Sequence, residues 1–113
     1  MSTGFKNAGE APEELSTYEI VREAILNKQP IHAFYDGYER YMCPHVIGTK
    51  KGVQQCLFYQ YAGQSKSGNP VGWKCVIISG LQNIRAFAGD WHTDTNHSKQ
   101  QTCVDSIDVE VEY

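Results

Sequence analysis

The stretch YQYAGQSKSGNPVGWK, residues 59–74, gathers the side chains of this chain that are best suited to holding a ligand. Its middle consists of glycine, serine, lysine, asparagine and proline, and aromatic residues lie on both sides. Gly63 and Gly68 can adopt backbone angles that expose N–H groups in a concave arrangement suited to an anion. The serine hydroxyls and lysine ammonium groups add donors and positive charge. This chemistry suits a phosphate group, although the spacing is not that of the P-loop motif.

The segment from Gly63 to Gly72 is ten residues long, whereas a hairpin loop needs only about two to five. The extra length favours a binding loop, and a solubilising hairpin tip is the alternative. Trp73 precedes Lys74, and an exposed ring there could stack on a nucleic-acid base, a contact worth roughly 1–3 kcal/mol. Packing in the core is the commoner role of such a ring. The candidate ligand-binding residues are His45, Tyr59, Gln60, Gln64, Ser65, Lys66, Ser67, Trp73 and Lys74.

The charge distribution also points to an anionic partner. Residues 40–85 contain six lysines and arginines and no acid, whereas residues 1–39 have a net charge of −4 and residues 86–113 of −5. A segment free of carboxylates suits a nucleotide or a single-stranded nucleic acid. The alternative is that these bases pair with acids of the two ends or are simply solvated.

Evidence for catalysis is weaker. His45 could donate to a ligand or act as an acid–base group, but such a histidine is more often structural. His92, Asp94 and His97 could bind a metal, although loop residues of these types are mostly solvated. The carboxylates of residues 108–112 alternate along a strand-like segment, so they share one solvated face. No nucleophile motif is present. We therefore predict no catalytic residue, no metal site and no cofactor, and the question of an enzyme stays open.

The cysteines and the hydropathy bear on location. None of the cysteines forms a C-x-x-C pair. We interpret them as reduced, mostly buried thiols of a cytoplasmic protein, with a disulfide framework as the alternative. No apolar run approaches the ~20 residues of a membrane span, and no secretory signal is visible. The cysteines are Cys43, Cys56, Cys75 and Cys103.

The elements that must position the loop begin with a helix. Residues 1–14 are predicted to be a disordered arm, and residues 15–113 a single domain. Ser16 followed by Glu19 is a capping box, so a helix should begin there. Pro30 should end that helix near residue 28.

Short β-prone segments follow the helix. Asp36-Gly37 predicts a two-residue hairpin turn, and the returning strand should end at Pro44. A second hairpin is predicted around the sequence TKKG, and GWKCVIIS is typical of a central strand. A helix followed by five or six strands predicts a mainly β (α+β) domain, in which the helix packs on a small antiparallel β-barrel or bent sheet. The later predicted elements are a strand at 81–88, a loop at 89–102 and a final strand at 103–113.

Residues 18–88 contain four short motifs: Pro44-His45 with Gly48, Tyr59-Gln60, the loop Gly63-Gln64-Ser65-Lys66-Ser67-Gly68, and Gly72-Trp73-Lys74. These motifs resemble those of the WYL-domain family, in particular its short stand-alone members. Two positions depart from the family pattern: Gln54-Gln55-Cys56 replaces the Trp-Tyr-Leu tripeptide, and Ser79-Gly80-Leu81 replaces the Asp-Arg-Ile signature.

The resemblance implies an Sm-like small barrel and a regulatory module that senses a small ligand or binds nucleic acid. Together with the loop chemistry, it leads us to expect a WYL-like module that binds an anionic ligand, either a nucleotide or a single-stranded nucleic acid. The alternative is a non-enzymatic protein-interaction or assembly module, which binds a protein partner or forms a homo-oligomer through an exposed strand edge. No membrane partner is expected.

Overall fold

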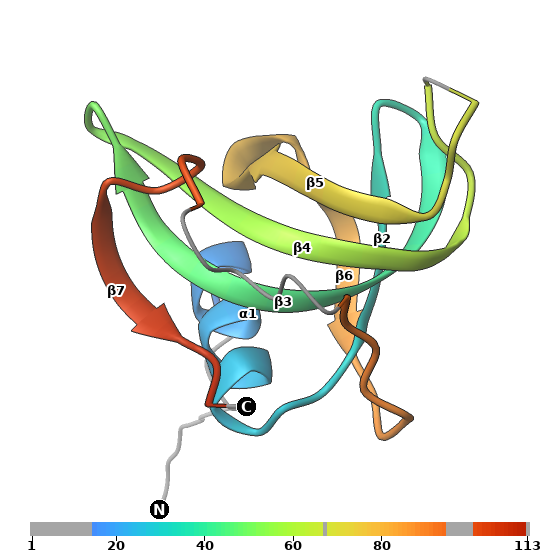
Figure 1. Ribbon diagram of the computed structural model, residues 1–113, viewed down its shortest axis with the longest axis horizontal. Helices are drawn as coiled ribbons and strands as arrows, with labels where there is room; N and C mark the ends of the chain where they lie inside the picture. The colour runs from blue at the N-terminus through green and yellow to red at the C-terminus, as the bar shows by residue number, and fades with distance from the viewer. Residues whose placement is uncertain (1–14, 67, 95–100, 113) are drawn as a thin grey trace, which may run out of the picture.

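The computed structural model describes residues 15–66, 68–94 and 101–112. Its architecture is mainly β, as predicted, with one helix and one antiparallel sheet among these residues (Figure 1). The predicted arm, residues 1–14, lies outside the described residues. The elements are α1 (Thr17–Leu26), β2 (Ile31–Tyr35), β3 (Tyr38–Lys50), β4 (Val53–Gly63), β5 (Gly72–Ile77), the 3₁₀ turn η1 (Ile78–Gly80), β6 (Gln82–Ala86) and β7 (Ser106–Glu110).

The sheet has the strand order β5-β4-β3-β2-β6, and β7 also pairs with β3. The long strands β3 and β4 bend strongly across the molecule (Figure 1). In the described part of the chain no pairing joins β5 to β6, so the sheet is open and a closed barrel is not observed. β2 pairs with the first half of β3 and β7 with the second half.

Local signals account for α1. The Glu19 N–H donates to Ser16 Oγ at 3.1 Å, and the Ser16 N–H donates to Glu19 Oε1 at 3.0 Å, which completes the predicted capping box. The helix ends at Leu26, slightly before the predicted point. Val21, Ala24 and its neighbour Ile25 are buried, so this face packs on the sheet.

The first hairpin confirms the Asp36-Gly37 turn. Both residues have positive φ angles, 55° and 78°, which a type I′ turn requires. Tyr35 pairs directly with Tyr38 across the turn. The second hairpin is also present, and its two-residue turn is Lys51-Gly52.

Pro44 does not end a strand, and this prediction was wrong. β3 continues through it to Lys50, and the register with β4 shifts between Pro44 and Val46. A proline has no N–H to give to a strand ladder, but a bulge relieves that demand by interrupting the pairing. The predicted central strand β5 instead lies at one end of the strand order, since its pairing with β4 is the only one in the described residues.

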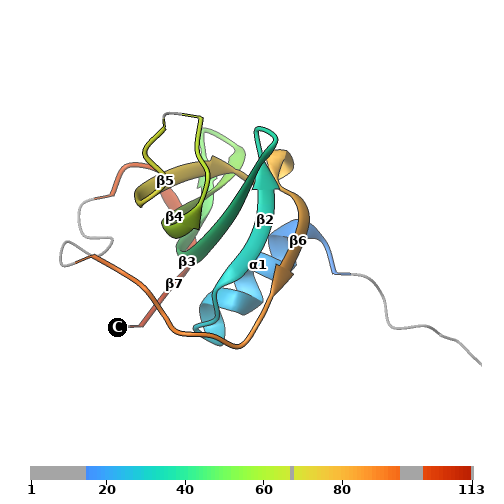
Figure 2. The same cartoon turned by 90° about the vertical axis from the view of Figure 1, so that its right-hand side faces the viewer.

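The two faces of the sheet carry separate apolar clusters. On one face α1 covers the main core, which includes Phe58 of β4 and Val76 of β5. On the other face the chain after β6 returns across the sheet, as its orange and red course in Figure 2 shows. There Cys103 and Val104 pack with Leu57 and contact Trp73. A side chain at Gly48 would collide with the Ser106 carbonyl, so this glycine allows the returning chain to approach β3.

Cys75 and Cys103 form a disulfide bond, and their Cα atoms are 5.6 Å apart. The prediction that all cysteines are reduced is therefore wrong for this pair. Cys43 and Cys56 are free and buried, and burial raises the pKa of the Cys43 thiol to about 11. The prediction of a cytoplasmic location rested partly on reduced thiols, and the disulfide removes that part of its basis. The location itself stays a prediction. Among the described residues, no helix has the length and apolar character that crossing a bilayer requires.

Candidate functional site

The predicted site residues divide between the two faces of the sheet. Lys74 lies opposite Phe58 in the β4–β5 ladder, and Trp73 lies opposite Tyr59. Residues directly opposite in a ladder point the same way, and successive residues alternate. Lys74 therefore belongs to the face that holds the main core, and Trp73 to the face covered by the returning chain. The structure does not bring these neighbours together around one ligand.

Lys74 lies against the Gly63–Gly72 loop. Its Nζ donates to the Asn69 carbonyl at 2.8 Å and lies 3.5 Å from Ser65 Oγ. Burial, and secondarily the positive charge of Arg40, lower the pKa of Lys74 below its ordinary value. The ammonium group is thus held at the inner side of the loop.

Gln60 fastens the beginning of the same loop. Its side chain is fully buried, and its amide Nε2 donates to the Gln64 carbonyl at 2.9 Å and to the Ala62 carbonyl at 3.2 Å. The Gln64 N–H also donates to the Glu39 carbonyl at 2.8 Å. Gln60 thus serves to hold the loop in place, and Gln64 is the residue that reaches its exposed side.

A pocket of about 310 Å³ opens beside these residues. We call it the loop pocket. Of the other loop candidates, Lys66 is exposed, and Ser67 lies outside the described residues. The residues that line the loop pocket are Tyr38, Gly63, Gln64, Ser65, Gly68 and Pro70.

His45, Tyr59 and Trp73 form an aromatic cluster on the opposite face. His45 is fully buried, and its ring centroid lies 4.7 Å from that of Trp73 and 4.9 Å from that of Trp91. Its Nδ1 lies 2.8 Å from the Cys43 carbonyl, and its Nε2 lies 3.0 Å from Thr93 Oγ1. These contacts are typical of a structural histidine in the core, which was the alternative interpretation of His45.

The indole N–H groups of Trp73 and Trp91 are buried and have no hydrogen-bond partner in the part of the chain that the structure describes. An unsatisfied buried donor is uncommon in a folded protein. Trp73 is half-buried, and its edge-to-face contact with Tyr59, at a centroid distance of 5.3 Å, occupies part of its surface. Stacking of a base on Trp73 stays a prediction, but it concerns a face other than that of Lys74.

Sequence reasoning missed Tyr38, which lines the loop pocket, and Arg40, which contacts the ring of Tyr38. Arg40 is only 3% exposed, and its guanidinium carbon lies 5.9 Å from the ring centroid of Tyr38. The signal was present in β3, where Tyr38, Arg40 and Met42 recur at every second position and so share the core face. An arginine in line with core residues indicates a buried charge that needs a partner.

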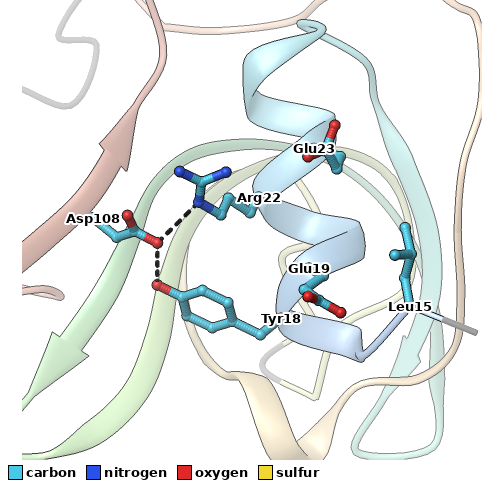
Figure 3. Close-up of a pocket in the computed structure, with 6 residues that line it drawn as sticks. All are labelled: Leu15, Tyr18, Glu19, Arg22, Glu23 and Asp108. Atoms are coloured by element: carbon cyan, nitrogen blue, oxygen red, sulfur yellow. Dashed lines mark hydrogen bonds and ion pairs between the residues drawn. The ribbon is translucent and has the colours of Figure 1, made fainter.

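A second hollow lies between α1 and β7 (Figure 3). Asp108 accepts a hydrogen bond from Tyr18 Oη at 2.7 Å and from Arg22 Nε at 3.1 Å. The carboxylates of the last strand were predicted to share one solvated face. Asp108 departs from this prediction, because its hydrogen bonds join β7 to α1. Burial, and then the hydrogen bond to Asp108, raise the pKa of Tyr18 from 10.0 to about 12.

We expect Asp108→Asn to lower the pKa of Tyr18 part of the way toward 10.0, since burial, the larger cause, would remain. The raised pKa stabilises the fold fully below pH 10, and this contribution is lost as the pH rises through about 12. Titration of the Tyr18 ring signals by NMR measures the shift. Asp105→Asn, a change at an exposed position just before β7, is the control. An unchanged Tyr18 titration in Asp108→Asn would contradict the assigned contact.

Metal binding finds no support in residues 15–66, 68–94 and 101–112, where no group of three or more His, Cys, Asp or Glu side chains could hold an ion. His97, one of the residues considered for a metal, lies outside the described residues. His92 stacks on Tyr61 with ring centroids 3.9 Å apart. The loop pocket therefore remains the candidate site.

The structure defines a small, mainly β domain with a pocket beside the Gly63–Gly72 loop, against which Lys74 lies. The chain matches no family model, and comparisons with curated proteins and with solved structures find no significant match.

Proposed function

We propose that this protein is a small ligand-binding module that holds an anionic ligand, either a nucleotide or a single-stranded nucleic acid, at the loop pocket. The observation that carries the proposal is the position of Lys74, whose ammonium group lies against the inner side of the Gly63–Gly72 loop. The surrounding segment, residues 40–85, contains no acid. An anion entering the loop pocket would therefore meet positive charge without competition from a nearby carboxylate of the same segment.

The aromatic part of the proposed site is Tyr38 and not Trp73. Tyr38 lines the loop pocket, whereas Trp73 points to the other face. A ring at the rim of an anion site can stack on a nucleobase and give affinity without sequence preference. The proposal thus keeps the anion chemistry of the loop and assigns the stacking contact to a different strand.

The proposed family is the WYL-domain family, and the proposed parent architecture is its Sm-like small barrel. In support, α1 precedes a strongly bent antiparallel sheet, and an Asp-Gly turn joins the first two strands. The motif residues Gly63, Gly68 and Gly72 all have positive φ angles. A regulatory role is part of this proposal, since sensing a small ligand is what the resemblance implies.

The expected effect of Lys74→Met is a roughly tenfold or greater loss of affinity, because a charge-assisted hydrogen bond contributes about 1.5–3 kcal/mol. The measurement is an NMR titration of isotope-labelled protein with a nucleoside 5′-monophosphate and with a short 5′-phosphorylated single-stranded RNA, at two salt concentrations. For the RNA, the salt dependence of log K should also weaken by about one unit of slope.

Lys51→Met is the matched control, because it removes the same charge from the exposed turn between β3 and β4. Its affinity should stay close to that of the wild type. Amide shifts that cluster at residues 60–74 would support the site. If neither ligand produces salt-sensitive shifts there, the proposed function is wrong.

A further inference from the structure

Arg40 is a buried arginine next to Tyr38, one of the residues that line the loop pocket. Arg40 is 3% exposed, and no carboxylate of residues 15–66, 68–94 or 101–112 forms an ion pair with it. Its Nε donates to the Tyr35 carbonyl at 3.3 Å and its Nη1 to Gln60 Oε1 at 3.2 Å. Its Nη2 group has no hydrogen-bond partner among the described residues. A buried charge without an opposite charge destabilises a fold, so its presence calls for an explanation.

Arg40 contacts the ring of Tyr35, with 5.2 Å between the guanidinium carbon and the ring centroid, and is connected to the loop pocket through two further side chains. Its guanidinium lies against the ring of Tyr38, with 5.9 Å between the guanidinium carbon and the ring centroid. It also bonds to Gln60, whose amide holds the Gln64 carbonyl. Tyr38 and Gln64 both line the pocket, so Arg40 lies directly behind its wall.

A second cation approaches the same place. Lys74 Nζ lies 3.5 Å from Oγ of Ser65, which lines the loop pocket. Burial, and secondarily the positive charge of Arg40, lower the pKa of Lys74. Bringing two like charges together is unfavourable unless an anion lies between or beside them. Among the described residues no carboxylate forms an ion pair with either cation, so this place is open to the anion of a ligand.

We propose that Arg40 is the buried anchor of a phosphomonoester site, in which Arg40 and Lys74 together bind a terminal phosphate group that enters through the loop pocket. This inference rests on the proposed function and names the chemistry that the site selects. A planar guanidinium presents paired N–H donors that match phosphate oxygens. A terminal phosphate carries a charge of about −1.5 to −2 at pH 7, which balances two cations, whereas a phosphodiester within a nucleic-acid chain carries a single negative charge.

The site then recognises the terminal phosphate of a ligand, whatever the length of the chain that follows it. Nucleoside 5′-monophosphates and 5′-phosphorylated single strands share the terminal phosphate and both fit this chemistry. Nucleosides lack the phosphate, and strands that begin with a 5′-hydroxyl carry only phosphodiesters. Tyr38 lines the pocket, and its ring would pack against the sugar or base that follows the phosphate.

The test compares adenosine, adenosine 5′-monophosphate and inorganic phosphate by isothermal titration calorimetry, together with one short RNA prepared with a 5′-phosphate and with a 5′-hydroxyl. The monophosphate and the 5′-phosphorylated RNA should bind at least about tenfold more tightly than their unphosphorylated counterparts. Binding of inorganic phosphate and the monophosphate, but of neither RNA, would identify the source as a small molecule. Equal binding of both RNA forms would overturn the inference.

Arg40→Met should reduce affinity for the monophosphate by roughly 10- to 100-fold. Arg40→Lys keeps the charge but loses the paired donors, so its affinity should fall between those of the wild type and Arg40→Met. The matched control is Arg85→Met, which removes an exposed positive charge from β6 and should leave affinity unchanged. Circular dichroism of each variant checks that it is folded, and Arg40→Lys keeps the test valid if Arg40→Met does not fold.

Different experimental results would contradict the inference and the proposed function. If the monophosphate binds, Lys74→Met weakens that binding and both Arg40 variants bind like the wild type, then Arg40 is a structural residue and only the inference is wrong. If no phosphate-containing probe binds to the wild type, the proposed function itself is wrong.

Discussion

Replacing Phe58 by alanine is expected to lower the free energy of unfolding by about 3–5 kcal/mol, because the change removes a large buried ring and leaves a cavity. Phe58 is 0% exposed and belongs to the main core between α1 and the sheet. It lies opposite Pro44 on one side and Lys74 on the other. Its ring thus supports both the bulge in β3 and the strand that carries the proposed cation.

Urea denaturation measures this effect, and the midpoint should fall while the slope with denaturant stays the same. Val53→Ala is the matched control, because Val53 also lies in β4 but is 45% exposed. That substitution should change the free energy of unfolding by less than about 0.5 kcal/mol. A Phe58→Ala protein within about 1 kcal/mol of the wild type would contradict the assigned core.

Reduction of the Cys75–Cys103 bond is expected to lower the free energy of unfolding by about 3–4 kcal/mol, as the chain-entropy estimate gives for the loop that it closes. The two cysteines are 28 residues apart in sequence, and the bond fastens the chain before β7 to β5. Gln55 strengthens the same junction, since its Nε2 donates to the Cys103 carbonyl at 2.7 Å. Urea denaturation with and without a phosphine reductant measures the difference.

The double variant Cys75→Ser/Cys103→Ser is the control for reduction. It should unfold near the midpoint of the reduced wild type and should not respond to the reductant. Trp73 packs against Cys103 and its neighbours, so its fluorescence should report the loosening of this face. Equal midpoints for the wild type with and without reductant would show that the bond does not stabilise the fold.

The helix and the first hairpin could be predicted from the sequence because their signals are local. The capping box joins Ser16 and Glu19, which are three residues apart, and both of its hydrogen bonds are present. The Asp36-Gly37 turn likewise needs only the two residues that adopt positive φ angles. A reading of neighbouring residues was sufficient for these elements.

The candidate site was predicted only in part. The loop from Gly63 to Gly72 was identified from its composition, and the structure places Lys74 against it. Arg40 was missed because it is 20 residues distant in sequence from Gln60, the side chain to which it donates. Long-range contacts of this kind depend on how β3 and β4 are paired, and their register contains two shifts.

By itself, the sequence determined the class of the domain, its helix, its tight turns and the acid-free segment that suggests an anionic ligand. The tertiary structure decided which side chains share a face. In a strand, successive residues point to opposite sides, so Trp73 and Lys74 are adjacent in the chain and yet belong to different surfaces. The β3–β4 pairing likewise brings Arg40 to Gln60, and the return of the chain before β7 brings Cys103 to Cys75. The folded arrangement, and not the distance in sequence, therefore sets which groups meet.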